Sequence, residues 1–459
     1  MVEGRTHKPV ILKERCQQCE VCLRGCPAEL IPEFRQEAGS LRGTLYQGKI
    51  SGSSANKPTP FPPCQEVCPV HQDTRGYAAL IAQGKFSEAL ERIQETNPLP
   101  AICGFVCHHP CEKACLREGV DSPVPLRLLK RFVAEYESAE VPLPTRRRRL
   151  KQAKILVVGS GPAGLAAAHD LSLLGYRVTI WEALPVAGGM LTVGIPEFRL
   201  PRGILHKEIQ RIQSLGVKME MNHRFHLDPG KKPLSKLGFD AAFIATGAHL
   251  SMKLNLPGEE RNGILYGVEF LREVNLGRRV ELGKRVSVIG GGNVALDAAR
   301  AALRLGSEVE VCYRRSREEM PAIPEEVDEA LREGAKLHLL SGPVRILRKG
   351  SRIAGLECVR MKLGEADDSG RRRPIPIQGS SFRVAADTLI AAIGQRTDRR
   401  ALNGLDLNVD GTVRVDLKTG ATSVKGIFAG GDVVTGPGWA IDAIQAGKRA
   451  AEGIRRYLS

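Results

Sequence analysis

Two segments of the chain share one pattern: a short apolar strand, a glycine-rich loop and a helix. The first begins at Lys154 and reads KILVVGSGPAGLAAAHDLSLLGYRVTIWEA, and the second begins at Arg285 and reads RVSVIGGGNVALDAARAALRLGSEVEVCYRR. This unit is typical of parallel α/β sheets that bind dinucleotides, because the glycine loop lets the backbone approach a pyrophosphate. A chain that carries the unit twice is predicted to form two Rossmann-like domains and to bind two dinucleotides.

The first glycine loop has the G-x-G-x-x-G spacing of dinucleotide-binding proteins. Its residues are Gly159, Gly161, Pro162, Ala163 and Gly164. The first glycine permits a tight turn, the second leaves room for the pyrophosphate, and the third lets the helix pack closely on the strand. The following strand ends at Glu182, at a position where an acid accepts hydrogen bonds from ribose hydroxyls. Together these features predict a dinucleotide site rather than a purely structural turn.

The second loop has the related spacing G-x-G-x-x-A, which the same fingerprint allows. Its residues are Gly290, Gly291, Gly292, Asn293 and Val294, followed by Ala295. The next strand ends without an acid and carries Arg314 and Arg315 instead. Guanidinium groups pair well with a 2′-phosphate, so the sequence favours NADP(H), with NAD(H) as the alternative. Ordinary surface charge is the other interpretation of these two arginines.

Cysteines are concentrated near the start of the chain, since ten of the 12 lie within the first 115 residues. The spacing C-x2-C-x2-C-x3-C, followed by proline, occurs at Cys16, Cys19, Cys22 and Cys26. Bacterial ferredoxins hold 4Fe–4S clusters with this spacing. Zinc is the competing metal, but zinc sites usually pair two C-x2-C knuckles. We therefore predict a 4Fe–4S cluster in this segment.

A second group of cysteines flanks a predicted helical segment, TRGYAALIAQGKFSEALERIQET. Its members are Cys64, Cys68, Cys103, Cys107, Cys111 and Cys115. The last four repeat every fourth residue, a spacing that places side chains on one face of a helix. Core packing alone would also explain such a face. Six cysteines around one helical segment are more than packing requires, so we predict metal binding here as well.

Composition argues against several other classes of protein. The chain has 459 residues, a formal net charge of +16 and only 2 tryptophans. It contains no apolar run near the roughly 20 residues of a membrane span and no apolar N-terminal signal, so we predict a cytoplasmic protein. The basic run from Arg146 to Arg149 is either a solvated linker or a contact for an acidic redox partner. No motif that reads nucleic acid accompanies the charge, so nucleic acid is not an expected partner.

Three further segments resemble flavin motifs of the glutathione-reductase-like superfamily. They are FIATGA, with Ala245, Thr246 and Gly247; LIAAIGQRTD, with Gly394; and GIFAGGDVVTGPGWAIDAI, with Gly431, Asp432 and Ala443. In that superfamily the aspartate meets the ribityl and pyrophosphate region of the flavin. The resemblance therefore implies that the first glycine loop binds FAD, which leaves the second loop for NADP(H).

Over roughly residues 61–459 the chain resembles the small chain of glutamate synthase, the flavin half of dihydropyrimidine dehydrogenase and the large subunit of ferredoxin:NADP transhydrogenases. The resemblance is carried by CQEVCPVH, NPLPAICGFVCHHPCEKAC, GSGPAG, AGGMLTVGIPEFRLP, GGGNVALD and YRRSREEMPA. It implies an α/β fold of two Rossmann-like, glutathione-reductase-like domains, with the NADP domain inserted in the FAD domain. It also implies a helical iron–sulfur domain before them, and it places Gly189 and Met190 near the flavin.

We divide the chain into six predicted segments. They are a ferredoxin-like 4Fe–4S segment (1–60), a helical iron–sulfur domain (61–140), a basic linker (141–153), the first part of the FAD domain (154–256), the NAD(P)-binding domain (257–384) and the second part of the FAD domain (385–459). The stretch VPLPTRRRR marks the linker, and strands alternate with helices from Lys154 onward.

The cysteines depart from the pattern of these families. The cysteine pair that relatives carry shortly before Cys64 is replaced by SANKPTPFPP. Cys111 follows Cys107 more closely than in the glutamate synthase small chain, and the position of Cys103 is not usually a ligand. We expect two 4Fe–4S clusters, and which cysteines serve which cluster stays open. Besides the ferredoxin-like run, the predicted ligands are Cys64, Cys68, Cys107, Cys111 and Cys115.

The resemblance implies that hydride passes between nicotinamide and FAD and that single electrons then move through the clusters. The leading hypothesis is a subunit of a hetero-oligomer that exchanges electrons between NADP(H) and a partner enzyme or ferredoxin. Candidate partners are the large chain of glutamate synthase and a 2-oxoacid:ferredoxin-type oxidoreductase. The alternatives are a free-standing NADPH:acceptor reductase and a redox-sensing binding protein.

The FAD and NADP domains contain no C-x-x-C or C-x4-C pair, which a disulfide reductase needs beside its flavin. Cys312 and Cys358 are therefore predicted to be packed thiols. We identify no catalytic side chain beyond the flavin, because in such enzymes the cofactors carry the redox chemistry.

Overall fold

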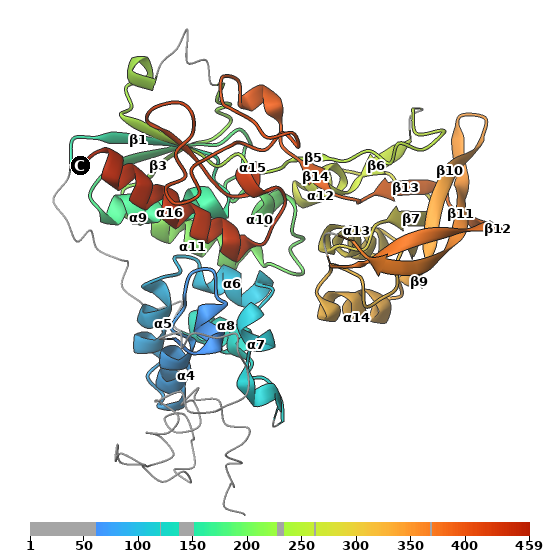
Figure 1. The fold of residues 1–459 in the computed structure, drawn as a ribbon, viewed down its shortest axis with the longest axis horizontal. Helices are drawn as coiled ribbons and strands as arrows, with labels where there is room; N and C mark the ends of the chain where they lie inside the picture. Colours follow the sequence, from blue (N-terminus) through green and yellow to red (C-terminus); the bar gives the residue numbers. More distant parts are fainter. Residues whose placement is uncertain (1–60, 120, 137–150, 227–233, 261–262, 368–369) are drawn as a thin grey trace, which may run out of the picture. The chain divides into compact units, whose positions relative to one another are not determined.

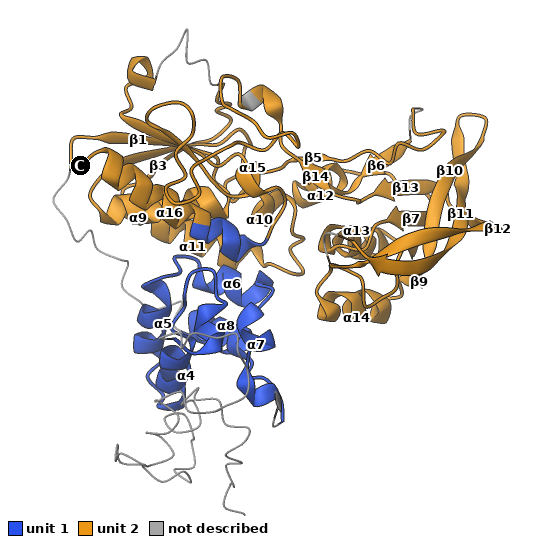
Figure 2. Cartoon of the chain, viewed as in Figure 1, with its two compact units in different colours: residues 1–145, 439–445 blue, residues 146–438, 446–459 orange. Residues whose placement is uncertain are grey.

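The computed structural model describes residues 61–459, except for 120, 137–150, 227–233, 261–262 and 368–369. The ferredoxin-like cysteine run and the basic run before the first strand lie outside the described residues. The chain divides into two compact units (Figure 2). One contains residues 1–145 and 439–445, and the other contains residues 146–438 and 446–459.

The described part of the first unit is helical, as the sequence predicts. Its helices are α3 (Pro63–Glu66), α4 (Thr74–Ala82), α5 (Phe86–Gln94), α6 (Pro100–Val106), α7 (Pro110–Lys113), the short η1 (Leu116–Gly119) and α8 (Leu126–Tyr136). Helix α4 begins after Asp73, whose side chain accepts a hydrogen bond from the amide of Gly76 at 2.9 Å. Helix α5 buries Ala89, Leu90 and Ile93, which share one face of the helix.

Helices α6 and α8 pack closely because of one glycine. A Cβ on Gly104 of α6 would lie 2.7 Å from the Cα of Arg131 on α8, so a larger residue would push the two helices apart. Helix α8 buries the charged residue Lys130 together with the apolar Val133. Among the helices that the structure describes, none is both long enough and apolar enough to cross a membrane.

The second unit contains two parallel five-stranded sheets (Figure 1). The first has the strand order β15-β4-β1-β2-β3. Its strands are β1 (Lys154–Val158), β2 (Arg177–Trp181), β3 (Lys218–Glu220), β4 (Ala241–Ile244) and β15 (Ile427–Ala429). One face is covered by helices α9 (Pro162–Leu173), α11 (Arg202–Ser214) and α16 (Ala440–Tyr457) (Figure 1). On the other face, Leu402, Leu405 and Val413 join the buried core beneath the sheet.

The second sheet has the order β6-β13-β7-β8-β9. Its strands are β6 (Ile264–Tyr266), β7 (Arg285–Ile289), β8 (Glu308–Cys312), β9 (Lys336–His338) and β13 (Thr388–Ala391), and its helices are α12 (Gly267–Asn275), α13 (Asn293–Arg304) and α14 (Pro324–Arg332). The two Rossmann-like sheets confirm the predicted fold class. Strand β13 pairs with β7, although it lies beyond residue 384, where the sequence placed the end of the second domain.

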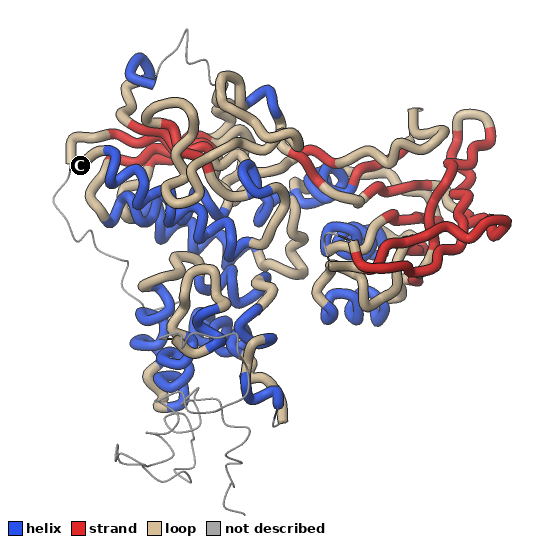
Figure 3. Tube along the Cα trace, viewed as in Figure 1, coloured by secondary structure: helices blue, strands red, loops and turns tan. Residues whose placement is uncertain are grey.

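A three-stranded antiparallel sheet beside the second domain was not predicted. It consists of the long strands β10 (Ser341–Lys349), β11 (Arg352–Ala366) and β12 (Arg372–Ala385) (Figure 3). The chain passes between the two domains twice, and the crossings pair as strands β5 (Leu250–Ser251) and β14 (Gln395–Arg396). The remaining short elements are α10 (Met190–Val193), η3 (Leu234–Leu237), η4 (Arg399–Ala401) and α15 (Asp432–Thr435).

Candidate dinucleotide and iron–sulfur sites

The first glycine loop joins β1 to α9, and its three glycines meet different surroundings. Gly159 has a φ of 103°, and a Cβ there would lie 2.4 Å from the carbonyl oxygen of Ala245. A Cβ on Gly164 would lie 2.0 Å from the carbonyl oxygen of Gly159. At Gly161, in contrast, no atom of the described residues lies within 4 Å of that position. Packing within the chain explains the first and third glycines, whereas the second leaves space for a ligand.

The open space at Gly161 lies at the N-terminus of α9. Gly161 is the N-cap of this helix and supplies no side-chain cap, so the amides of the first turn are free to meet an anion. Space and an uncapped helix N-terminus are what the pyrophosphate of a dinucleotide requires. The geometry of the loop therefore fits a bound dinucleotide.

Glu182 follows β2 and is buried against the same loop. Its Oε2 accepts hydrogen bonds from the Ser160 amide at 2.9 Å and from the Ser160 hydroxyl at 2.6 Å. Its Oε1 accepts one from the Leu184 amide at 2.9 Å. The Ser160 hydroxyl in turn accepts a hydrogen bond from the amide of Gly188 at 3.0 Å. The carboxylate thus holds the glycine loop and the following segment in one arrangement, at the strand end where a ribose would lie.

The predicted flavin motifs meet at one edge of the first sheet. Strand β4 pairs with both β1 and β15, so Ala245, Thr246 and Gly247 after β4 lie between the glycine loop and Gly431–Asp432 after β15. Ligands of open α/β sheets bind at this carboxyl edge. Asp432 opens α15 and accepts a hydrogen bond from the Gly438 amide at 3.2 Å.

Four of the predicted flavin residues lie outside the ends of β1, β4 and β15. Two of them, Gly189 and Met190, lie beside the first glycine loop, and the other two do not. Gly189 and Met190 are at the start of α10, and a Cβ on Gly189 would lie 2.8 Å from the Cα of Gly161. Gly394 instead follows β13 of the second sheet, and its carbonyl accepts a hydrogen bond from the Met252 amide at 3.0 Å. Ala443 lies in the 439–445 stretch, which groups with the helical unit.

The second glycine loop repeats the geometry of the first. Gly290 has a φ of 147°, and a Cβ there would lie 2.2 Å from the carbonyl oxygen of Ala392. A Cβ on Gly291 would touch the ring of Tyr313 at 2.5 Å. The nearest described atom to a Cβ on Gly292 is a carbon of Pro321, 3.8 Å away. That distance is an ordinary van der Waals contact, so the second glycine of the fingerprint again has room for a Cβ at the N-terminus of a long helix, here α13.

The first turn of α13 holds the remaining predicted residues of this loop. Asn293 begins the helix, and its side-chain oxygen accepts a hydrogen bond from the amide of Ile323 at 2.9 Å. Val294 follows and is half-buried. Both residues thus shape the helix end that faces the open space.

The two arginines after β8 have different surroundings. Arg314 is exposed. Arg315 is 3% exposed, and its guanidinium pairs with the carboxylate of Asp367 at 2.5 Å and donates to the carbonyl of Arg372 at 2.8 Å. Arg315 therefore ties the end of β8 to the β11–β12 hairpin, and Arg314 is the one that presents its charge to solvent.

The described cysteines of the helical unit are mostly buried. Cys64, Cys68, Cys103, Cys107 and Cys111 are buried, and Cys115 is half-buried. The sulfur of Cys64 accepts a hydrogen bond from the Thr74 hydroxyl at 3.1 Å, and that of Cys107 accepts one from the His109 amide at 3.4 Å. Burial raises the pKa of Cys107, and it raises the pKa of Cys111 to about 12.

Lys130 of α8 is buried beside these thiols, at 7% exposure. Burial lowers its pKa, but the neighbouring Cys103, Cys107, Cys68 and Cys111 raise it by more. Lysine is rarely buried without a compensating partner, and cysteines that ligate a cluster as thiolates would be such a partner. In the described residues no three His, Cys, Asp or Glu side chains are placed to hold a single metal ion. The ligands of an iron–sulfur cluster are cysteine thiolates, so the gathered cysteines with a buried lysine beside them are a donor set that would suit such a cluster.

The spacing of the four cysteines at every fourth residue suggested that they share one helix face. In the structure they do not. Helix α6 ends at Val106, and Cys107 is already extended. His109 has a φ of 44°, and Pro110 then begins α7. Proline lacks the amide that would continue the earlier helix, so the chain turns between Cys107 and Cys111.

Cys312 and Cys358 meet in one buried cluster, a proximity that the sequence did not reveal. They are 1% and 0% exposed and share the cluster with Leu356 and Ile289. Cys312 ends β8, and Cys358 lies on β11, so the pair joins the second sheet to the antiparallel sheet. Their burial agrees with the prediction of packed thiols.

Comparison with known proteins identifies the family. Residues 153–447 match the model of the pyridine nucleotide-disulphide oxidoreductases. The chain belongs to this family. Residues 59–141 match a second model, described as dihydropyrimidine dehydrogenase domain II with a 4Fe–4S cluster. A pyridine nucleotide-disulphide oxidoreductase domain and a 4Fe–4S domain are therefore joined in this chain. This confirms the predicted oxidoreductase fold and the predicted iron–sulfur domain before it.

Relatives of this oxidoreductase include subunits of larger enzymes. The NADP(+)-dependent formate dehydrogenase subunit beta of Moorella thermoacetica is 46% identical over 429 residues, which cover 88% of this chain and 60% of that subunit. The chain thus spans about three fifths of that relative. The glutamate synthase [NADPH] small chain of Azospirillum brasilense is 33% identical, over 86% of each chain. The predicted resemblance to the glutamate synthase small chain is confirmed.

Solved structures support the fold of the oxidoreductase part. FprA from Mycobacterium tuberculosis in complex with NADPH has a TM-score of 0.57 and 21% identity to this chain. The match covers 67% of this chain and 85% of FprA. At this identity the likeness shows a common fold and no more.

One prediction concerns the cysteines. Replacing Cys107 or Cys111 with serine should remove about four irons from a full-length chain that binds about eight, because each loss opens one cubane. Iron and acid-labile sulfide, measured after anaerobic purification, check this result. Cys103→Ser and Cys358→Ser are the controls and should keep full iron content. A chain with about four irons before any substitution would contradict the expected two clusters.

Proposed function

We propose that this oxidoreductase is an NADP-linked electron-transfer subunit, which moves electrons between NADP(H) and a redox partner through FAD and two 4Fe–4S clusters. The observation that carries the proposal is the repeated geometry of the glycine loops, in each of which the second glycine lies at a helix N-terminus and no atom crowds its Cβ position. The buried thiols of the helical unit support the same conclusion. When bound, FAD accepts a hydride and releases electrons singly, which is the chemistry that links a nicotinamide to iron–sulfur clusters.

The residues of the first loop bind and orient the flavin. The space at Gly161 and the N-terminus of α9 accept its pyrophosphate, and Asp432 meets its ribityl chain. Glu182 accepts hydrogen bonds from the ribose hydroxyls while it holds the glycine loop in place. Gly189 and Met190 begin the segment that lies beside the loop.

The residues of the second loop bind NADP(H) in preference to NAD(H). The space at Gly292 and the N-terminus of α13 accept the pyrophosphate. The exposed guanidinium of Arg314 meets the 2′-phosphate. Arg315 supports this site from beneath through its pair with Asp367.

The names of the relatives support a role as one subunit of a larger enzyme. One is a subunit beta and the other is a small chain. We propose a hetero-oligomer in which the terminal reaction takes place on a partner subunit or on a ferredoxin. The partner delivers or receives electrons one at a time, because iron–sulfur clusters transfer single electrons.

Anaerobic steady-state assays of the full chain, loaded with its cofactors, test the proposed function. A clostridial-type 2[4Fe–4S] ferredoxin and benzoquinone serve as alternative acceptors for electrons from NADPH. We expect NADPH to reduce the flavin and the ferredoxin to turn over. Rapid turnover with benzoquinone and none with ferredoxin would favour a free-standing reductase. A flavin that NADPH does not reduce would overturn the proposal entirely.

A further inference from the structure

One continuous segment links the two candidate dinucleotide sites. Residues 188–202 begin at the first glycine loop, where the amide of Gly188 donates to the Ser160 hydroxyl at 3.0 Å. Gly189 lies against Gly161, since a Cβ on Gly189 would be 2.8 Å from the Cα of Gly161. Near its end the same segment contacts α13 and α14 of the second domain through Phe198 and Arg199. We call residues 188–202 the connecting segment.

Hydrogen bonds inside and beside the connecting segment keep it in one conformation. The guanidinium of Arg202 donates to the carbonyls of Leu191 at 3.1 Å and Ile195 at 2.9 Å. From the second domain, the side-chain amide of Asn275 on α12 donates to the carbonyl of Val193 at 3.0 Å. The segment is therefore braced at both ends of α10.

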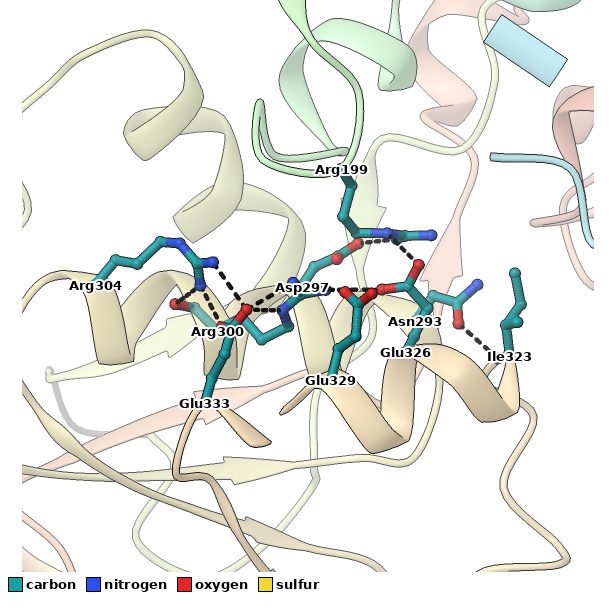
Figure 4. A network of polar contacts seen from close by, with 9 residues as sticks. All are labelled: Arg199, Asn293, Asp297, Arg300, Arg304, Ile323, Glu326, Glu329 and Glu333. Carbon is teal, nitrogen blue, oxygen red and sulfur yellow. Dashed lines mark hydrogen bonds and ion pairs between the residues drawn. The ribbon is translucent and has the colours of Figure 1, made fainter. Parts of the chain in front are cut away.

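Arg199 anchors the segment to the second domain (Figure 4). Its Nη1 lies 2.6 Å from Oδ2 of Asp297 on α13, and its Nε lies 2.9 Å from Oε1 of Glu326 on α14. The three side chains are only 6%, 4% and 13% exposed, respectively. One guanidinium thus bridges the two helices.

The anchor continues into a larger network on α13 and α14 (Figure 4). Arg300 pairs with Glu326 at 2.9 Å, with Glu329 at 2.8 Å and with Glu333 at 2.7 Å. The ring of Phe198, next to Arg199, lies 4.6 Å from the guanidinium carbon of Arg300. Arg199 is thus the member of this network that comes from the connecting segment, and the other members lie on α13 and α14.

The anchor point is close to the end of α13 that faces the candidate pyrophosphate space. Asp297 lies one helical turn beyond Asn293, whose side-chain oxygen accepts the amide of Ile323, the N-cap of α14. Arg199 holds these same two helices. Besides the crossings at β5 and β14, the connecting segment thus gives a second, braced path from Gly161 to α13.

Burial of such a pair calls for an explanation other than stability. Desolvation largely cancels the attraction within a buried ion pair, and an apolar replacement often stabilises a protein equally well. Burial raises the pKa of Asp297 to about 6 even with Arg199 beside it. A buried, directional contact instead favours one relative position of the parts that it joins.

We propose that Arg199 is a positioning residue, which sets the NADP domain against the FAD domain so that the nicotinamide reaches the flavin. The inference rests on the proposed function, because it presupposes two bound dinucleotides. It assigns a role in the hydride step to a residue that touches neither glycine loop. Hydride transfer is sensitive to such placement, since a shift of about 1 Å can slow a reaction about 100-fold.

Stopped-flow reduction of the flavin by NADPH, with Arg199→Met and Arg199→Lys in the full chain, tests the proposal. We expect the limiting rate to fall about 10- to 100-fold in Arg199→Met, with partial recovery in Arg199→Lys, which keeps the charge. FAD content and the affinity for 2′,5′-ADP, measured by calorimetry, should stay within about twofold, because neither ligand spans the two domains. Hydrogen exchange should become faster in the connecting segment and at the start of α13.

Arg285→Met is the matched control. Arg285 forms an exposed ion pair with Asp387 at 2.9 Å inside the second domain, so its loss should leave the limiting rate unchanged. Asp297→Asn is a milder second variant if Arg199→Met does not fold. Limiting rates within twofold of the wild type in Arg199→Met and Asp297→Asn would overturn the proposal, as would loss of 2′,5′-ADP binding in both. A wild-type flavin that NADPH does not reduce would instead refute the proposed function.

Discussion

Replacing Gly292 with valine should abolish flavin reduction by NADPH and leave FAD and iron content unchanged. The φ and ψ of Gly292, −93° and 173°, suit any residue, so valine adds no backbone strain. Its side chain would fill the space where the pyrophosphate of NADPH would lie. We expect the affinity for 2′,5′-ADP and NADPH to fall about 100-fold or more, which is about 3 kcal/mol. Calorimetry and stopped-flow absorbance measure the two losses.

Gly161→Val should give the complementary result. Gly161 also has extended backbone angles, −68° and 179°, and its Cβ position is open. The variant should fold, retain 2′,5′-ADP binding and lose FAD. Gly203 on α11 is the matched control, because a Cβ there also meets open space but no ligand is expected. A Gly161→Val protein that keeps stoichiometric FAD would show that the flavin pyrophosphate lies elsewhere.

Replacing each of the two neighbouring arginines with methionine should have different consequences. Arg314→Met should raise KM for NADPH about 10- to 100-fold and leave KM for NADH unchanged, because a charged hydrogen bond is worth about 1.5–3 kcal/mol. The protein should keep its thermal stability, since Arg314 is exposed. Steady-state kinetics with both nucleotides measure the change.

Arg315→Met should act on the fold. Its loss would leave the carboxylate of Asp367 without the guanidinium that pairs with it now, so we expect the free energy of unfolding to fall by about 3 kcal/mol. Chemical denaturation of both variants separates the effects. If the Arg315→Met protein stays stable and loses affinity for NADPH but not for NADH, Arg315 rather than Arg314 binds the 2′-phosphate.

The parts of the fold set by local sequence could be predicted. The apolar strand, the glycine loop and the helix adjoin one another in the chain, so β1–α9 and β7–α13 were evident from residues alone. The glycine spacing also indicated which position would remain open. Helices of the cluster domain followed from their apolar periodicity.

Other features depend on residues that are distant in sequence. Arg199 and Asp297 are 98 residues apart, and no local pattern connects them. The antiparallel sheet brings Cys358 to Cys312 by the same kind of long-range pairing. Arg314 and Arg315 are adjacent residues of one type, but in the bend after β8 the first is exposed and the second is buried, a difference that no local pattern reveals.

Anaerobic titration of the full chain with NADPH, followed by absorbance and electron paramagnetic resonance, tests the central claim most directly. The account predicts that the flavin band bleaches first and that the signal of reduced 4Fe–4S clusters then appears. NADH at the same concentration should act much more slowly. Bleaching without any cluster signal, under conditions where dithionite reduces the clusters, would contradict electron transfer from NADPH through the flavin to the iron–sulfur domain.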